Sequence, residues 1–171
     1  GSRSTALGYS ALFAQNFTTA TDSYNIAVGY NAGGSVTTGV ANTLIGGLAG
    51  DALTDADSNV AVGQNALSAD TLGSLTTAIG QGALANQNFT TATNTHNTAV
   101  GYDAGSAVST GIYNTLIGSQ SGDALTDGNN NVAVGPNSLG SETRADRNVA
   151  VGSYALAAQN LTTDTDSYNT A

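Results

Sequence analysis

A five-residue pattern recurs nine times along this chain and constrains its fold more than any other feature. Its places hold a polar residue, a variable residue, Ala or Leu, a branched aliphatic residue and glycine. Steps between successive glycines are 21, 17, 17, 17, 21, 17, 17 and 17 residues, so three units of 17 and one of 21 make a super-repeat of 72. Such regularity predicts a repeat architecture. The pattern closes at Gly8, Gly29, Gly46, Gly63, Gly80, Gly101, Gly118, Gly135 and Gly152.

The pattern predicts a short β-strand rather than a helix. A helical spacing of apolar residues is never sustained, and glycine recurs too often for a stable helix. In a strand, side chains alternate between faces, so the second and fourth places share one face and the third place lies on the other. The fourth place is always branched, which suits a pleated sheet, and the glycine permits a bend after the strand.

We therefore expect each unit to form one coil of a β-solenoid, with equivalent strands stacked roughly 4.8 Å apart. The expected single domain spans residues 1–171 as coils 4–24, 25–41, 42–58, 59–75, 76–96, 97–113, 114–130, 131–147 and 148–168, and we expect it to be a fragment of a longer array. Stacking also aligns the asparagines at the first place into a ladder along the axis. Besides the glycines named above from Gly29 onward, the structural motif comprises Asn25, Val28, Asn42, Ile45, Asn59, Val62, Ile79, Asn97, Val100, Asn114, Ile117, Asn131, Val134, Asn148 and Val151.

One aliphatic-glycine pattern per coil favours a flattened roll with two short strands per coil over a three-sided helix of six-residue units. Such a coil buries only two or three apolar side chains, which is little for an isolated rod. A small residue follows each motif glycine by three places, as at Ala32 and Ser121. We expect these small residues to let another chain approach closely, so that the protein oligomerises side by side.

The segments "NIAVGYNA", "NVAVGQNA", "TTAIGQGA" and "NVAVGSYA" carry a resemblance to known proteins. They resemble the head repeats of YadA-type trimeric autotransporter adhesins and the similar repeats of bacteriophage tail fibres. This resemblance covers all nine coils and implies a left-handed parallel β-roll, an interlocked homotrimer, and adhesion to cell-surface or matrix targets. The coils here are longer than is usual in that family, and no segment resembles its neck, stalk or membrane anchor.

Composition argues against several other classes of function. Among 171 residues there is no Cys, one His and one Glu, so thiolate metal sites and most acid–base sites lack their residues. A formal charge of −9 with three arginines opposes binding to nucleic acid. No apolar run is long enough to span a membrane. We expect neither enzymatic activity nor a cofactor.

Every fourth coil carries four additional residues, in "NFTTATDSY", "NFTTATNTH" and "NLTTDTDSY". Extra length in a stacked coil must loop outward, so these segments should recur on one edge roughly 19 Å apart. Either they contact a receptor or they only cover a seam between chains. The candidate receptor-contact residues are Asn16, Phe17, Tyr24, Asn88, Phe89, His96, Asn160, Leu161 and Tyr168.

Other polar and aromatic residues have structural and functional interpretations. His96 aligns with Tyr24 and Tyr168 and so occupies an aromatic position rather than that of a metal ligand. The charged coil with Glu142, Arg144 and Arg147 should be a solvated face. Tyrosines just beyond the motif glycine could stack on sugars, although packing against a neighbouring chain is favoured. These tyrosines are Tyr9, Tyr30, Tyr102 and Tyr154.

The repeated "GDALTD" segments bring carboxylates into matching turns. Carboxylates can gather Ca²⁺, but no known calcium-binding loop pattern is present, so turn capping is the favoured role. The aspartates concerned are Asp51, Asp55, Asp57, Asp123 and Asp127.

The sequence thus predicts an extracellular structural and adhesive fibre segment, located on a virion tail fibre, a bacterial surface or a secreted filament. Its expected partners are copies of itself and a cell-surface glycan or protein. A self-assembled filament without receptor binding is the main alternative. An ice-binding solenoid would need a Thr-x-Thr in every coil, which is absent. A carbohydrate-active enzyme would need paired carboxylates in a groove.

Overall fold

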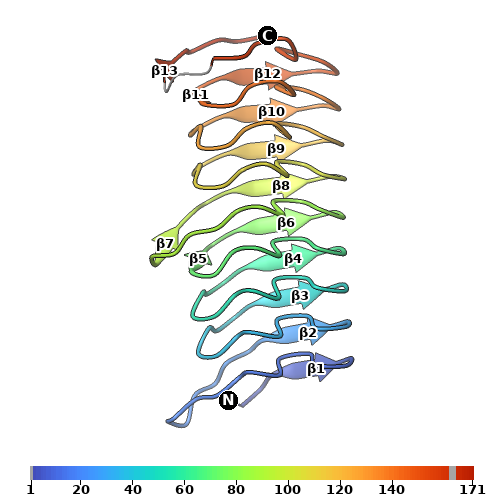
Figure 1. Ribbon diagram of the computed structural model, residues 1–171, viewed down its shortest axis with the longest axis vertical. Coiled ribbons are helices and arrows are strands. Elements are labelled where there is room, and N and C mark those ends of the chain that lie inside the picture. Colours follow the sequence, from blue (N-terminus) through green and yellow to red (C-terminus); the bar gives the residue numbers. More distant parts are fainter. Residues whose placement is uncertain (1, 162–164) are drawn as a thin grey trace.

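A computed structural model describes residues 2–161 and 165–171, and the side chains of residues 145 and 165 are left undescribed. Within these residues the chain is all-β, without a helix, and forms a parallel β-solenoid of about nine turns (Figure 1). One three-residue strand per coil contributes to a nine-stranded sheet. Its strands, in spatial order, are β1 (Thr5–Leu7), β2 (Ile26–Val28), β3 (Thr43–Ile45), β4 (Val60–Val62), β6 (Thr77–Ile79), β8 (Thr98–Val100), β9 (Thr115–Ile117), β10 (Val132–Val134) and β12 (Val149–Val151).

The register of this sheet confirms the alignment read from the repeat. Ala27 pairs with Leu44 across a 17-residue coil, and Ala78 pairs with Ala99 across a 21-residue coil. The four extra residues therefore leave the main sheet undisturbed. They protrude at the edge opposite the strand arrowheads, where Figure 1 shows the long coils extending beyond their neighbours.

A second strand in every coil was predicted, and this prediction is wrong for most coils. Four further strands form two short parallel pairs: β5 (Gly73–Ser74) with β7 (Thr93–Asn94), and β11 (Ala145–Asp146) with β13 (Thr165–Asp166). Elsewhere on this side, a side chain replaces the backbone acceptor. Asp57 Oδ1 accepts from Val40 N–H at 2.8 Å, and Asn129 Oδ1 accepts from Ile112 N–H at 2.9 Å.

Each motif glycine holds a backbone conformation that disfavours a side chain, and from Gly8 to Gly135 the spacing to the next coil excludes one as well. The φ of Gly46 is +135°, and a Cβ there would lie 2.5 Å from the carbonyl oxygen of Gly63 in the next coil. The next residue, Gly47, would meet nothing within 4 Å in the described part of the chain. The motif glycine is thus required because successive coils touch backbone to backbone at this corner.

The third place of the pattern points into the coil, where large and small residues are complementary. Leu44 is fully buried, and its methyl groups occupy the space that a Cβ would need at both Gly33 and Gly50. Leu116 relates in the same way to Gly105 and Gly122. Several coils with Ala at the third place instead bury a leucine four residues after the motif glycine, whereas the coils of Ala27 and Ala99 have Gly33 and Gly105 there. These leucines include Leu67, Leu84 and Leu139.

The small residues three places after the glycine also lie inside. Ala32, Ala49 and Ala66 are fully buried in the core cluster, and Ser121 is buried as well. Their assignment to a surface for chain-to-chain approach is therefore wrong. The chain turns back over the strand after the glycine, so these positions face the interior. Coils between residues 25 and 130 bury from two to four apolar side chains each, a slightly wider range than predicted.

The asparagine ladder exists, but its bonds run mainly to backbone. Asn42 N–H donates to Asn25 Oδ1 at 2.9 Å, while Asn42 Nδ2 donates to the Ala56 carbonyl at 2.7 Å. Each amide nitrogen thereby donates to a carbonyl of its own coil, and each amide oxygen accepts from the backbone N–H of the next ladder residue. A bond between neighbouring side-chain amides is present from Asn131 to Asn114, at 3.1 Å. All seven asparagines are buried: Asn25, Asn42, Asn59, Asn97, Asn114, Asn131 and Asn148.

The long coil repairs the ladder where asparagine is absent. Thr76 N–H still donates to Asn59 Oδ1, and Gln87 Nε2 donates to Thr76 Oγ1 at 3.0 Å. Gln87 Oε1 in turn accepts from Asn97 Nδ2 at 2.8 Å. The Asn97 N–H donates to Thr95 Oγ1 at 3.3 Å in place of an asparagine side chain, and the buried Gln87 joins the two ladder positions across the 21-residue coil.

Candidate functional site

The outer face of the nine-stranded sheet carries aliphatic side chains that are half-buried or exposed. Because the third place points inward, the second and fourth places point outward along the whole rod. The fourth place is aliphatic in every coil, and Ile79 in β6 remains 37 % exposed. A row of aliphatic side chains, one per coil and none of them fully buried, makes this face a candidate interaction surface. We call this surface the aliphatic face; its fourth-place residues are Leu7, Val28, Ile45, Val62, Ile79, Val100, Ile117, Val134 and Val151.

The candidate contact residues of the long coils divide into exposed and covered groups. Asn16, Asn88 and Asn160 are exposed. Phe17 and Leu161 are half-buried, and Phe89 is only 8 % exposed. The backbone N–H of Phe89 donates to the buried carboxylate of Asp70 at 3.0 Å. The ring of Phe89 is thus covered in this structure and does not offer a contact surface, contrary to expectation. Residues 162–164, which complete the third segment, lie outside the described residues.

Tyr24, His96 and Tyr168 are exposed, but they lie next to the asparagine ladder rather than at a loop tip. Each directly precedes a ladder position and stacks on the equivalent residue of a neighbouring coil. Arg3 lies over the ring of Tyr24 at 5.5 Å, and Arg147 lies over that of Tyr168 at 5.5 Å. The rings of His96 and Tyr113 stack with centroids 5.0 Å apart.

We call this row the edge rank. The sequence prediction missed Tyr113, although its distance of 17 residues from His96 placed it in the same register. Its members in the described coils are Arg3, Tyr24, Ala41, Ser58, Leu75, His96, Tyr113, Asn130, Arg147 and Tyr168.

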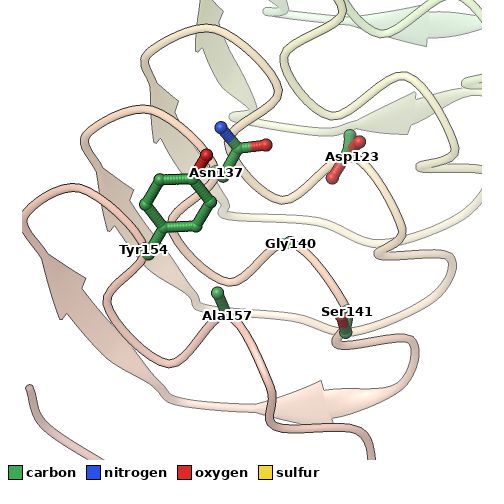
Figure 2. Close-up of a pocket in the computed structure, with 6 residues that line it drawn as sticks. All are labelled: Asp123, Asn137, Gly140, Ser141, Tyr154 and Ala157. Atoms are coloured by element: carbon green, nitrogen blue, oxygen red, sulfur yellow. The ribbon is translucent and has the colours of Figure 1, made fainter.

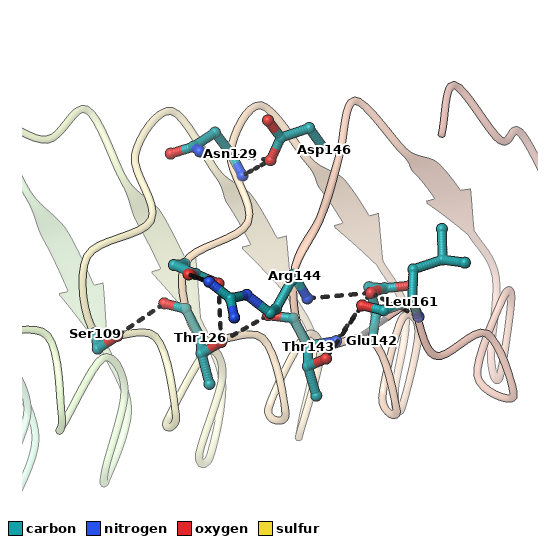
Figure 3. Close-up of polar contacts among 9 residues, drawn as sticks. Ser109, Thr126, Asn129, Glu142, Thr143, Arg144, Asp146 and Leu161 are labelled. Carbon is teal, nitrogen blue, oxygen red and sulfur yellow. Dashed lines mark hydrogen bonds and ion pairs between the residues drawn. The ribbon is translucent and has the colours of Figure 1, made fainter. Parts of the chain in front are cut away.

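The charged coil is not simply a solvated face. Glu142 is fully buried, and its Oε1 accepts from the backbone N–H of Thr143 at 3.0 Å and of Leu161 at 3.1 Å (Figure 3). Its Oε2 accepts from Gln159 Nε2 at 2.9 Å. Arg144 is exposed and pairs with Asp127 at 2.7 Å. Burial of Glu142 is tolerated because backbone and amide donors surround the carboxylate.

Glu142 stands seven residues after the motif glycine, and the residue at this place differs among the coils of one super-repeat. Asp70 is the counterpart of Glu142 one super-repeat earlier, and its Oδ2 accepts from Gln87 Nε2 at 2.6 Å. The two preceding coils carry Val36 and Leu53 at this position, both fully buried. Two apolar coils thus alternate with two polar coils, in which an acid and a glutamine pair across adjacent coils.

The carboxylates in the repeated turns form hydrogen bonds or ion pairs within the protein. Asp57 accepts from a backbone N–H, Asp55 accepts from the hydroxyl of Thr38, and Asp127 pairs with Arg144. Asp51 Oδ2 lies 3.5 Å from the donating amide of Asn31. Among the described residues, no three His, Asp or Glu side chains converge as a metal site would require. No helix in the same residues is long and apolar enough to cross a membrane.

Burial raises the pKa of the Asp51 carboxyl from its ordinary value of 3.8, although its own backbone N–H and Asn31 act in the opposite direction. Asp51 Oδ1 is buried without a hydrogen-bond partner among the described residues. The pKa of Asp123, its counterpart, is raised mainly by burial, with the charge of Asp103 contributing. Both carboxylates are thus poorly solvated in the folded chain.

Asp51→Asn should therefore stabilise the protein at neutral pH. A raised pKa means that the folded chain holds the proton more tightly, so stability falls as pH rises from 3.8 through the raised folded-state pKa. Since the site is partly exposed, we expect the thermal midpoint to rise by only about 1–2 °C at pH 7. At pH 3, where the carboxyl is neutral, no gain is expected. Circular dichroism melts at both pH values measure this, and a lower midpoint at pH 7 would contradict the desolvation argument.

Comparison of the chain with protein-family models, with curated proteins and with solved structures found no match.

Proposed function

We propose that this chain is an extracellular fibre segment that assembles as a homotrimer and attaches to a cell surface. The observation that carries the proposal is the aliphatic face, because its half-buried and exposed aliphatic side chains recur in register along the whole rod. Each coil has only a small core, so burying this face against identical chains would add apolar burial in every coil. Parallel, in-register chains would repeat the same contact from end to end.

The resemblance to head repeats of YadA-type adhesins and of tail fibres supports the same assembly. It implies a left-handed roll, and it places such rods outside the cell or on a virion. Such a rod attaches through many weak, identical contacts that form at the same time, so its overall avidity exceeds the affinity of any one contact. The edge rank is a suitable contact surface because its aromatic and basic side chains are exposed and recur along one edge.

The mass of the protein in solution tests this assembly. The wild-type chain of 16.8 kDa should elute at three times its mass in size-exclusion chromatography with light scattering at micromolar concentration. Ile79→Asp places a charge on the aliphatic face and should give a monomer. Leu75→Asp is the matched control, since Leu75 is 39 % exposed on the edge rank and should leave the trimer intact. A wild-type monomer would exclude the homotrimer.

The same variants test attachment. Fluorescently labelled wild-type protein should bind intact bacterial or epithelial cells, and monomeric Ile79→Asp should bind at least about 100-fold more weakly because avidity is lost. Equal binding by the two proteins would contradict the avidity mechanism. A trimer that binds none of these cells would instead support the filament without receptor binding.

A further inference from the structure

A surface pocket of about 240 Å³ lies beside the corner of coils 114–130, 131–147 and 148–168 (Figure 2). Figure 2 shows the ring of Tyr154 on one side, the amide of Asn137 beside it and the carboxylate of Asp123 across a gap floored by Gly140. Pockets for drug-sized ligands are typically about 300–1,000 Å³, so this pocket suits one small ring. Its lining residues are Asp123, Asn137, Gly140, Ser141, Tyr154 and Ala157.

Tyr154 occupies a position where an aromatic residue gains little from the fold. Its φ is +61°, a left-handed conformation that disfavours side chains with a Cβ. Its side chain is 67 % exposed. The equivalent residue of the preceding super-repeat is Gly82, which adopts the same conformation without strain. The left-handed φ recurs at this place in every coil, as at Leu48 and Asn137, so the distinctive feature of Tyr154 is its exposed aromatic ring, which is available to pack against a ligand.

The preceding super-repeat contains the same corner without the pocket's two distinctive residues. Gly140, which opens the floor, replaces Ser68, and Tyr154, which forms the wall, replaces Gly82. Asp123 and Asn137 have counterparts in Asp51 and Asn65. The acid and amide therefore belong to the repeated coil, whereas the open floor and the aromatic wall occur together here.

We infer that this pocket binds an uncharged saccharide ring. An exposed aromatic face packs against the C–H face of a sugar, and the Asp123 carboxylate can accept two hydroxyl hydrogens in charge-assisted bonds. Asn137 and Ser141 add a donor and acceptors at the rim. Asp103 and the net charge of −9 disfavour acidic sugars. The inference deepens the proposed attachment by naming a ligand class, and it rests on that proposal only for its biological role.

Saturation-transfer NMR on the whole chain tests this inference with neutral glucose, galactose and mannose oligosaccharides and one sialylated analogue. Probes at about 10 mM exceed the roughly 1 mM dissociation constant expected of a one-ring contact. At least one neutral probe should receive saturation from the wild-type protein. Tyr154→Gly and Gly140→Ser should each weaken this binding at least about tenfold, while Tyr102→Ser should not change it.

These variants separate binding from folding. Tyr154→Gly restores the residue of the preceding super-repeat and relieves a left-handed φ, so its thermal midpoint should not fall. At Gly140, a Cβ would lie 3.2 Å from the Asn137 carbonyl oxygen and 3.5 Å from Asp123 Oδ1, so it would fill the pocket at the cost of a small shift, and Ser68 occupies the equivalent position one super-repeat earlier. Tyr102 is an exposed tyrosine elsewhere, and its equivalents Ser119 and Ser153 show that serine is accepted there.

Three results would overturn the inference: no transfer to any neutral probe, undiminished transfer in both pocket variants, or binding of the sialylated probe alone. Light scattering on the same samples keeps this test distinct from that of the proposed function. A trimer that attaches to cells without binding a neutral probe would refute the pocket inference only. A monomer that binds the probe through Tyr154 would refute the trimer only.

Discussion

Gly46→Ala is expected to destabilise the solenoid strongly, although it adds a single methyl group. The new Cβ would lie 2.5 Å from the Gly63 carbonyl oxygen, which belongs to the backbone of the next coil and cannot rotate away. The φ of +135° is also unfavourable for alanine. Together these effects should cost about 3–5 kcal/mol. The thermal midpoint should fall by roughly 10 °C for a chain of this length.

The adjacent Gly47 provides a matched control. Gly47→Ala adds the same methyl group one residue further along, where nothing in the described chain lies within 4 Å. We expect its thermal midpoint to stay within about 1–2 °C of the wild-type value. Circular dichroism melts of the two variants compare the sites directly. Similar midpoints for both would show that the coils are not in backbone contact at this corner.

The second large effect is expected from Asn42→Ala, in the middle of the ladder. Asn42 Oδ1 accepts from Asn59 N–H at 2.9 Å, and Asn42 Nδ2 donates to the Ala56 carbonyl at 2.7 Å. Removing the side chain leaves two buried backbone groups without partners, at about 1–3 kcal/mol each. Denaturant unfolding should therefore show a loss of about 2–6 kcal/mol. Asn94→Ala, on an exposed residue of β7, should be nearly neutral.

Asn42→Thr sharpens the interpretation of this loss. Thr76 stands at a ladder position, but Gln87 of the same coil bonds to it. In coil 42–58 the position of Gln87 is held by Leu53, which has no amide. Threonine should therefore rescue little of the stability lost in Asn42→Ala. Full rescue would mean that the backbone bonds across coils suffice without the side-chain amide.

The repeat spacing was enough to predict the β-solenoid, its nine coils and the register in which the motif strands pair. That prediction succeeded because a step of 17 or 21 residues returns each motif glycine to the same corner, where only glycine fits. The asparagine ladder followed from the same alignment. The main hydrogen-bond partners of the ladder could not be predicted in this way. The hydrogen bond from a side-chain amide to a backbone carbonyl, such as that of Ala56, depends on how the coil closes.

The candidate site was predicted less well. Phe89 looked like an exposed aromatic residue, and Glu142 looked like part of a charged surface, yet both are buried. The path of the long coil decides the placement of Phe89, and Gln159 with the Leu161 backbone surrounds Glu142. At both places, residues that are 17 or more positions apart in the sequence come into contact. No local sequence pattern therefore indicated that Phe89 and Glu142 are buried.

Strand alternation by itself determined that Ala27 and Val28 lie on opposite faces. It left open which face is inside, and only the tertiary structure decided that the smaller residue is buried and the branched one exposed. The reason is the narrow width of the coil. Leucines of the two neighbouring coils, Leu12 and Leu44, reach the space beside Gly33, so this coil has room only for a small inward residue at position 27. The larger aliphatics are thereby left on the outer face.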